Sequence, residues 1–199
     1  MDQEKEVIQI RDVTQDEILL SALRLFTTKG YFSTSLVDVA QLLEMENTSV
    51  IYQHFKDKKM MASQLYVNIF DSLDISVDDI SRKNEKASEQ LKGLTDLLFK
   101  LTDEAPDVMR FLLVLKLGEF LPDEKQIHET LPFLKVVKII ERGINSGEIR
   151  AIDPQLACAY FFGIVNNTLR LVLMGVLDKK ADAYLSQVWF SAWNTIAKK

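Results

Sequence analysis

Two stretches near the N-terminus decide the fold: Ala22–Ala40, which reads ALRLFTTKGYFSTSLVDVA, and Val50–Lys59, which reads VIYQHFKDKK. The first begins inside a segment, 14–28, whose apolar residues recur every three or four positions, as on one face of a helix. Gly30 follows as a helix stop, because glycine readily takes the left-handed conformation that ends many helices. This part of the chain therefore predicts one helix that ends near Gly30 and another that begins soon after it.

Two further short helices are expected before the long segments of the chain begin. Thr34 and Ser35 are suitable caps for a short amphipathic helix that runs to Leu43. A polar turn, 44–47, separates this helix from a third one at 48–54. Three short helices with a four-residue turn between the second and the third predict a helix-turn-helix.

The rest of the chain has the pattern of longer amphipathic helices. Asp57 is the expected cap of a long helix, and Pro132 either begins or kinks a later one. Further helices are expected near 85–103, 107–120, 125–145, 154–176 and 181–197. We therefore expect an all-α protein of about nine helices, divided into a helix-turn-helix domain at 1–57 and a helical domain at 58–199.

The composition favours long helices and a cytoplasmic protein. Only 7 Gly and 4 Pro occur among 199 residues, which is too few for a sandwich or barrel of many short strands. The single cysteine, Cys158, excludes a disulfide framework within the chain. Met1–Glu6 is acidic and lacks the apolar core of a signal peptide. The centre of the segment 156–177 holds Asn166, Asn167, Thr168 and Arg170, so we expect a helix buried in protein and not a membrane span.

The third short helix has a polar face suited to nucleic acid, although the net charge of the chain is −5. Thr48, Ser49, Tyr52 and Gln53 can all form hydrogen bonds, and the segment 47–56 contains no acidic residue. The N-terminus of a helix adds free N–H groups and partial positive charge, which attract phosphate. Two interpretations are open at this point: a DNA-binding surface, or three core helices with a solvated polar face.

The residues of both stretches resemble the DNA-binding region of the TetR family of bacterial transcriptional repressors. In that family the first helix ends in Phe-x-x-x-Gly-Tyr/Phe, and Thr-Ser/Thr and then Ile/Val-Ala follow. A Tyr-x-His/Tyr-Phe segment then precedes a lysine three positions further on. This chain matches in register at Phe26, Gly30, Tyr31, Thr34, Ser35, Val39, Ala40, Tyr52, His54, Phe55 and Lys58. The resemblance covers about the first third of the chain, and a helical remainder of this length also fits the family.

The resemblance implies DNA contacts for eight residues. Phosphate contacts are expected for Thr34, Ser35, Tyr52, His54 and Lys58. Thr48 and Ser49 lie at the entry of the recognition helix, where they would reach base edges, and Gln53 is a further hydrogen-bonding group on that helix. The alternative role of the Thr and Ser residues is helix capping, and that of the others is plain exposure to solvent.

One segment departs from the family pattern. The turn Glu44–Asn47 is one residue longer than usual and lacks the family's glycine. We expect Asn47 to cap the third helix and to take the left-handed backbone conformation in place of that glycine. Glu44 and Glu46 would lie near phosphate, which disfavours DNA binding.

For the helices after Asp57 the resemblance implies a ligand cavity and a dimer interface made by the last two helices. Candidate ligand-binding residues are Met109, Phe111, Phe120, Phe161, Asn166, Asn167 and Arg170. Candidate interface residues are Phe162, Trp189 and Trp193. Ordinary core packing, pairing within the core or exposure is the alternative for each of these side chains.

These observations together predict a ligand-responsive regulator of transcription. We expect a cytoplasmic homodimer that binds a palindromic operator in double-stranded DNA, releases it when a small hydrophobic effector binds, and contacts no membrane. No metal-ligand spacing, phosphate loop or nucleophile motif is present, so neither catalysis nor a cofactor is expected. The alternative is a helical adaptor, or a small-molecule or lipid-binding protein, with the same fold but without DNA binding.

Overall fold

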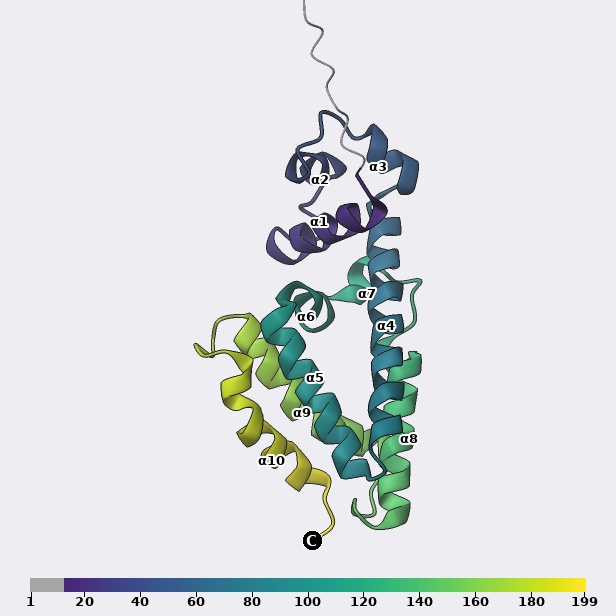
Figure 1. The fold of residues 1–199 in the computed structure, drawn as a ribbon, viewed down its shortest axis with the longest axis vertical. Helices are drawn as coiled ribbons and strands as arrows, with labels where there is room; N and C mark the ends of the chain where they lie inside the picture. Colours follow the sequence, from purple (N-terminus) through teal and green to yellow (C-terminus); the bar gives the residue numbers. More distant parts are fainter. Residues whose placement is uncertain (1–12) are drawn as a thin grey trace, which may run out of the picture.

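The computed structural model describes residues 13–199, and α-helices form almost all of its regular structure (Figure 1). The expectation about Met1–Glu6 lies outside the described residues. Within 13–199 there is no strand, only one isolated backbone bridge, Ile149–Ala197, which confirms the all-α class. Ten α-helices and two 3₁₀ helices occur there, with the bounds α1 Gln15–Thr28, α2 Leu36–Leu42, α3 Ser49–His54, α4 Lys58–Lys83, α5 Ala87–Glu104, α6 Pro106–Leu113, α7 Leu117–Phe120, η1 Ile127–Glu129, α8 Leu131–Ser146, α9 Pro154–Leu173, η2 Ala181–Tyr184 and α10 Leu185–Ile196.

Local caps determine where α1 and α2 begin and end. The Thr14 hydroxyl accepts a hydrogen bond from the Glu17 backbone N–H at 3.3 Å, and the Glu17 carboxylate accepts one from the Thr14 N–H at 3.0 Å. These two reciprocal hydrogen bonds form a capping box at the start of α1. Gly30, with φ 93°, ends α1 in the left-handed region. Ser35 and Asp38 form a second capping box at the start of α2.

The turn between α2 and α3 differs from the expectation. Glu44, not Asn47, has the positive φ, at 56°. The Met45 N–H donates to the Ala40 carbonyl at 2.9 Å, and the Glu44 N–H donates to the Gln41 carbonyl at 3.1 Å. This is the pattern of a Schellman motif, in which the residue after the C-cap must be left-handed, at a cost of roughly 1–2 kcal/mol for a residue other than glycine.

The start of α3 is one residue later than expected. Thr48 occupies the N-cap position, but its side chain makes no capping hydrogen bond. The Asn47 side chain closes the turn instead, because its Oδ1 accepts a hydrogen bond from the Ser49 N–H at 2.9 Å. An asparagine that bonds to the backbone two residues ahead is an Asx turn, which explains why a polar residue suits this place.

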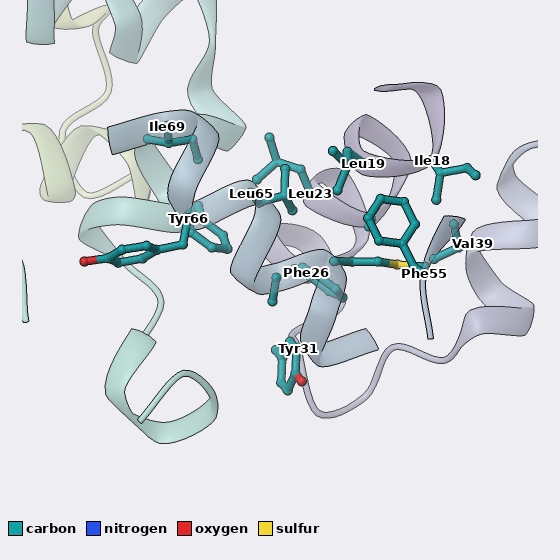
Figure 2. Close-up of a cluster of buried hydrophobic side chains, with 14 of the residues drawn as sticks. Ile18, Leu19, Leu23, Phe26, Tyr31, Val39, Phe55, Leu65, Tyr66 and Ile69 are labelled. Atoms are coloured by element: carbon teal, nitrogen blue, oxygen red, sulfur yellow. The ribbon is translucent and has the colours of Figure 1, made fainter. Parts of the chain in front are cut away.

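The long helix α4 belongs to both halves of the molecule (Figure 1). Asp57 caps it as expected, since its Oδ1 accepts a hydrogen bond from the Met60 N–H at 2.8 Å. Leu65 and Ile69 lie in a first hydrophobic core with side chains of α1 to α3 (Figure 2). Val77 lies in a second core, formed with α5, α8 and α9. The first half of α4 therefore packs with the N-terminal helices, and the proposed domain division at 57/58 stays a prediction.

The segment expected to form one helix at 107–120 forms two, α6 and α7. Its apolar residues divide between the two cores: Met109 packs in the second, whereas Phe111 and Phe120 pack in the first. The break after Leu113 redirects the chain, and the Phe120 ring then stacks on Tyr31 with 4.1 Å between ring centroids. One straight helix over 107–120 would not bring Phe120 into the first core while Met109 packs in the second.

Two other predicted helices are also shorter than expected. α8 begins at Leu131, so Pro132 lies in its first turn, where the missing N–H costs no hydrogen bond and causes no kink. The residues before it, expected to be helical from 125, form a loop and η1. At the C-terminus, the segment expected at 181–197 divides into η2 and α10.

Only one face of α9 is buried, contrary to the expectation of a helix enclosed by protein. Its buried side chains are Ala157, Cys158, Phe161, Val165 and Leu169. Leu156 and Tyr160 on the other face are each 42% exposed. Among the described helices, α9 alone is long and apolar enough to cross a membrane by length and composition, which is weak evidence for a span.

Gly143 in α8 provides a test of the second core. A Cβ atom at this position would lie 2.7 Å from the Ala87 Cβ and 2.7 Å from the Ile149 Cδ1. Gly143→Ala should therefore lower the free energy of unfolding by about 1–2 kcal/mol, measured by urea denaturation, because overpacking exceeds the gain in helix propensity. Gly118→Ala is the matched control, because an added Cβ there meets nothing within 4 Å. An equally stable Gly143→Ala protein would contradict this packing.

Candidate nucleic-acid interface and ligand cavity

The recognition helix α3 is held by two buried side chains and exposes its polar ones. Ile51 and Phe55 are almost completely buried in the first core. Figure 2 shows Phe55 within this core. Tyr52 is 57% exposed, and Ser49 and Gln53 are also exposed. Three of the predicted DNA-binding residues thus share the solvent-facing side of a helix whose opposite side is fixed by packing.

Thr48 and His54 lie at the two ends of α3, and both are half-buried. The Thr48 hydroxyl makes no capping hydrogen bond, so the capping alternative does not apply to it. The His54 ring lies beside the Phe55 ring, with 6.5 Å between centroids. Base or phosphate contact by these two residues stays a prediction.

Thr34 and Ser35, both predicted to bind phosphate, have different surroundings. Thr34 is only 3% exposed, and its hydroxyl donates to the Gly30 carbonyl at 2.8 Å. A buried hydroxyl that is bonded within the chain is not placed to bind phosphate, so the structure gives Thr34 the task of closing the α1–α2 connection. The Ser35 hydroxyl is exposed but is bonded to Asp38, with 2.7 Å between Oγ and Oδ2.

Asp38 carries a negative charge close to this candidate phosphate site. A hydrogen bond from Lys29, at 2.7 Å, together with those from Ser35, lowers the pKa of Asp38 to about 2. The carboxylate therefore remains ionised at neutral pH, with Lys29 as its counter-ion. In the turn, Glu44 and Glu46 are exposed as expected.

Lys58, also predicted to bind phosphate, holds α4 against the α1–α2 connection. Its Nζ donates to the Tyr31 and Thr34 carbonyls, each at 2.8 Å, and lies 4.4 Å from the Tyr31 ring centroid. Burial lowers the pKa of Lys58. Two of its three donors are therefore used within the chain, and a phosphate contact through the remaining donor stays a prediction.

The loop between α7 and α8, residues 121–130, runs along α4 and is tied to it at three successive points. The Asp123 carboxylate pairs with Lys59 at 2.5 Å, and Glu124 accepts a hydrogen bond from Ser63. The Tyr66 hydroxyl donates to a backbone carbonyl of the same loop at 2.5 Å. We call this loop the α4 strap. It connects the first turns of α4 with α8 in the C-terminal half of the molecule.

An apolar cavity of about 180 Å³ lies among α4, α5, α6, α8 and α9. Thr130 and Asn166 are its polar lining residues, and no charged side chain of the described chain lines it. Its apolar lining residues are Phe70, Leu73, Val77, Leu94, Leu97, Leu98, Met109, Leu112, Leu113, Ile127, Pro132, Phe133, Val136 and Phe162. A concave, mostly apolar site with few polar groups is typical of a small-molecule site.

Two of the predicted ligand-binding residues line this cavity, namely Met109 and Asn166. Asn167 and Arg170 lie on the exposed side of α9, where the Arg170 Nη2 donates to the Asn167 Oδ1 at 3.2 Å. Adjacent helical residues are about 100° apart around the helix axis, so Asn166 faces the cavity while its neighbour does not.

Three aromatic candidates pack in a core instead of lining the cavity. Phe111 and Phe120 belong to the first core and Phe161 to the second. Conversely, sequence analysis did not single out the cavity residues of α4, α5 and α8, such as Phe70, Leu98 and Phe133. Their only signal is an apolar helix stripe, which does not distinguish a cavity wall from a packed core.

The three candidate interface residues make contacts within their own chain. Phe162 lines the cavity. Trp189 stacks on Trp193 with 5.6 Å between centroids, and the Lys92 Nζ of α5 lies 5.9 Å from the Trp189 ring centroid. The role of these three residues in a dimer stays a prediction. The most exposed large apolar side chain on α10 is Phe190, at 68%.

A polar contact joins α6, which lines the cavity, to the end of α1. The Asp107 Oδ1 accepts hydrogen bonds from the Thr27 hydroxyl at 3.0 Å and from the Arg110 Nη1 at 3.1 Å. Leu112 and Leu113 of the same helix line the cavity. One short helix therefore touches both the helix-turn-helix and the cavity.

No family model matches the chain. It is 31% identical over 86 residues to IcaR, the HTH-type negative transcriptional regulator of the biofilm operon icaADBC from Staphylococcus aureus. This match covers 43% of the chain and 44% of IcaR, so the chain is matched over less than half the length of that relative.

Solved structures match nearly the whole chain. A TetR family transcription regulator from Marinobacter aquaeolei VT8 superposes with a TM-score of 0.76 at 18% identity, over 92% of this chain and 95% of that one. FadR from Bacillus subtilis, in complex with stearoyl-CoA, superposes with a TM-score of 0.67 at 18% identity, over 90% and 97% of the two chains. The chain therefore has the fold of the TetR family of transcription regulators, which is the family that its helix-turn-helix residues resemble.

Proposed function

We propose that this protein is a ligand-responsive transcriptional regulator that binds operator DNA through α3 and releases it when a small apolar molecule occupies the cavity. The observation that carries the proposal is the placement of α3. Its apolar side is fixed by Ile51 and Phe55, and its exposed side presents Ser49, Tyr52 and Gln53. Relatives support this function, since IcaR is a negative transcriptional regulator and the FadR structure holds an acyl-CoA.

DNA binding requires a local excess of positive charge, because phosphate contacts supply much of the affinity. The exposed Lys56 and the N-terminus of α3 supply it beside the recognition helix. Glu44 and Glu46 oppose it. We therefore expect the affinity for operator DNA to be modest and to fall steeply as the salt concentration rises.

A dimer gives the recognition helices the spacing of successive major grooves, roughly 34–36 Å. α9 and α10 pack on each other, and the sides of these helices that remain exposed are the proposed dimer interface. Leu156, Tyr160 and Phe190 provide apolar surface there, and such surface at the centre of an interface is typical of homodimers. A dimer of this kind would cover the apolar residues that α9 exposes to solvent in the single chain.

The switch is proposed to act through α4, α6 and the α4 strap. Ligand contacts with Leu112 and Leu113 would move α6, and Asp107 on that helix contacts Thr27 of α1. Ile127 of the strap also lines the cavity. A ligand shifts this equilibrium only by its difference in affinity for the two states, typically 1–3 kcal/mol.

The second candidate is a small-molecule or lipid-binding protein that does not bind DNA. The acidic turn and the ionised Asp38 beside Ser35 favour it. An electrophoretic mobility-shift assay with the DNA upstream of the protein's own gene distinguishes the two. Binding to a palindromic site at low salt supports the regulator, whereas no binding at micromolar protein supports the binding protein.

Tyr52 tests the recognition helix. Tyr52→Phe removes an exposed hydroxyl and should weaken operator binding about twofold to tenfold, with a similar loss on unrelated DNA, because a phosphate contact carries no sequence information. Fluorescence anisotropy with labelled duplexes measures both losses. Tyr184→Phe, which removes a hydroxyl of η2 that bonds only to Asp178 and Lys179, should change neither. Unaltered DNA affinity in Tyr52→Phe would show that this hydroxyl is only solvated.

Phe190 tests the dimer. Phe190→Glu places a charge on the proposed apolar interface and should convert a species of about twice 22.8 kDa into one of 22.8 kDa in light scattering. Phe32→Glu is the matched control, because Phe32 is also 68% exposed but lies in the α1–α2 connection. If wild type is monomeric at micromolar concentration, the proposed dimer is wrong.

Thr27 tests the coupling route. Thr27→Val removes the hydroxyl that bonds to Asp107 and should reduce the effect of ligand on operator affinity about fivefold, while ligand affinity without DNA stays the same. Thr28→Val is the control, because the Thr28 hydroxyl bonds only to Arg24 of its own helix. Equal coupling in both variants would exclude this contact as a route.

A further inference from the structure

We infer that the cavity is built for a compact, uncharged aromatic molecule with a single hydrogen-bonding group, such as a substituted phenol, and that Asn166 binds this group. The inference rests on the proposed function, because it names the class of effector for the same cavity. Three properties of the cavity carry it: its volume, its lack of charged side chains, and the environment of the Asn166 amide.

The volume limits the ligand to about one ring with small substituents. An apolar cavity of about 150 Å³ holds benzene, whereas sites for drug-sized ligands measure about 300–1,000 Å³. The cavity of this protein, about 180 Å³, is larger than the benzene-binding cavity by little more than the volume of one small substituent. A long acyl chain exceeds this volume, so only part of it would lie inside the cavity.

The charges around the cavity disfavour an anionic ligand. A carboxylate that loses water in an apolar site needs a cation or several hydrogen-bond donors. Lys135 on α8 is already paired with Asp74 at 2.7 Å and with Asp78 at 2.8 Å. Arg110 on α6 is paired with Asp107 at 3.1 Å. Neither cation lines the cavity, so no basic group is available to a carboxylate or phosphate there.

The Asn166 amide is the polar group that is free to bind a ligand. It lines the cavity and makes no hydrogen bond to any other residue within 13–199. The other polar lining residue, Thr130, already donates its hydroxyl to the Ile127 carbonyl at 2.6 Å. An amide offers one acceptor oxygen and two donor hydrogens, so it pairs equally well with a hydroxyl or a carbonyl.

Aromatic side chains from three helices favour a ring as the apolar part of the ligand. Phe70 of α4, Phe133 of α8 and Phe162 of α9 all line the cavity. Aromatic rings gain additional stabilisation from edge-to-face or offset contacts with one another. A phenol combines such a ring with one hydroxyl. The ring can pack on the phenylalanine side chains, and the hydroxyl can pair with the Asn166 amide.

The experiment titrates the full-length protein, without DNA, with p-cresol and with p-xylene, in which a methyl group replaces the hydroxyl. Calorimetry should show p-cresol binding about threefold to tenfold more tightly than p-xylene, since one hydrogen bond is worth that factor. Asn166→Leu should remove the difference while p-xylene still binds. The control Asn68→Leu, which changes an exposed amide on α4, should keep it.

Two further probes test size and charge. 4-Methylbenzoate, which carries a carboxylate in place of the hydroxyl, and stearoyl-CoA should both bind more weakly than p-cresol. Leu98→Trp should fill the cavity and abolish binding of p-cresol, and circular dichroism establishes that each variant is folded. Tighter binding of either anionic probe, or an unchanged ratio of p-cresol to p-xylene affinity in Asn166→Leu, would overturn the inference.

Failure of the inference and failure of the proposed function give different results. Calorimetry without DNA decides the ligand class alone. If p-cresol binds as expected but the protein binds no DNA, the regulator is excluded and the ligand class stands. If the protein binds its operator but no compact phenol binds the cavity, the regulator stands and the ligand class is wrong.

Discussion

The uninterrupted helix α4 is the constraint on which the rest of the structure depends. Its first half packs in one hydrophobic core through Leu65 and Ile69, and its second half packs in another through Val77. Because every turn of an α-helix is hydrogen-bonded to the next, the two cores cannot tilt independently where they share it. The position of α3 relative to the cavity is therefore set largely by one rigid element that begins immediately after α3.

Beside α4, the two halves are joined by apolar packing of Phe111 and Phe120 in the first core and by several polar contacts. Lys58 bonds to two backbone carbonyls of the α1–α2 connection, Asp107 bonds to Thr27, and Lys59 pairs with Asp123 of the strap. Exposed ion pairs and single hydrogen bonds are each worth about 1 kcal/mol or less, so they exchange more easily than packed side chains. These polar contacts are therefore the parts of the junction that can change most easily if the protein switches between two arrangements.

The C-terminal half of the molecule has two different apolar surfaces. The cavity is lined by five helices and has few polar groups, which suits a small molecule. The exposed side of α9 and α10 carries Leu156, Tyr160 and Phe190, an apolar surface that suits the proposed contact with a second subunit. Asn166 and Asn167 lie on these two different sides of α9, so neighbouring residues of one type have different surroundings.

Sequence by itself determined the features that depend on residues close together in the chain. The capping boxes at Thr14 and Ser35 and the cap at Asp57 connect residues three positions apart, so their patterns predict the helix starts directly. Only the tertiary structure decided which polar groups are free. The Lys58 Nζ donates to the carbonyl of Thr34, 24 positions earlier in the chain, and the cavity wall combines residues from five helices. Such contacts depend on how whole helices pack, and an apolar stripe reads the same whether it faces a filled core, a cavity or a partner.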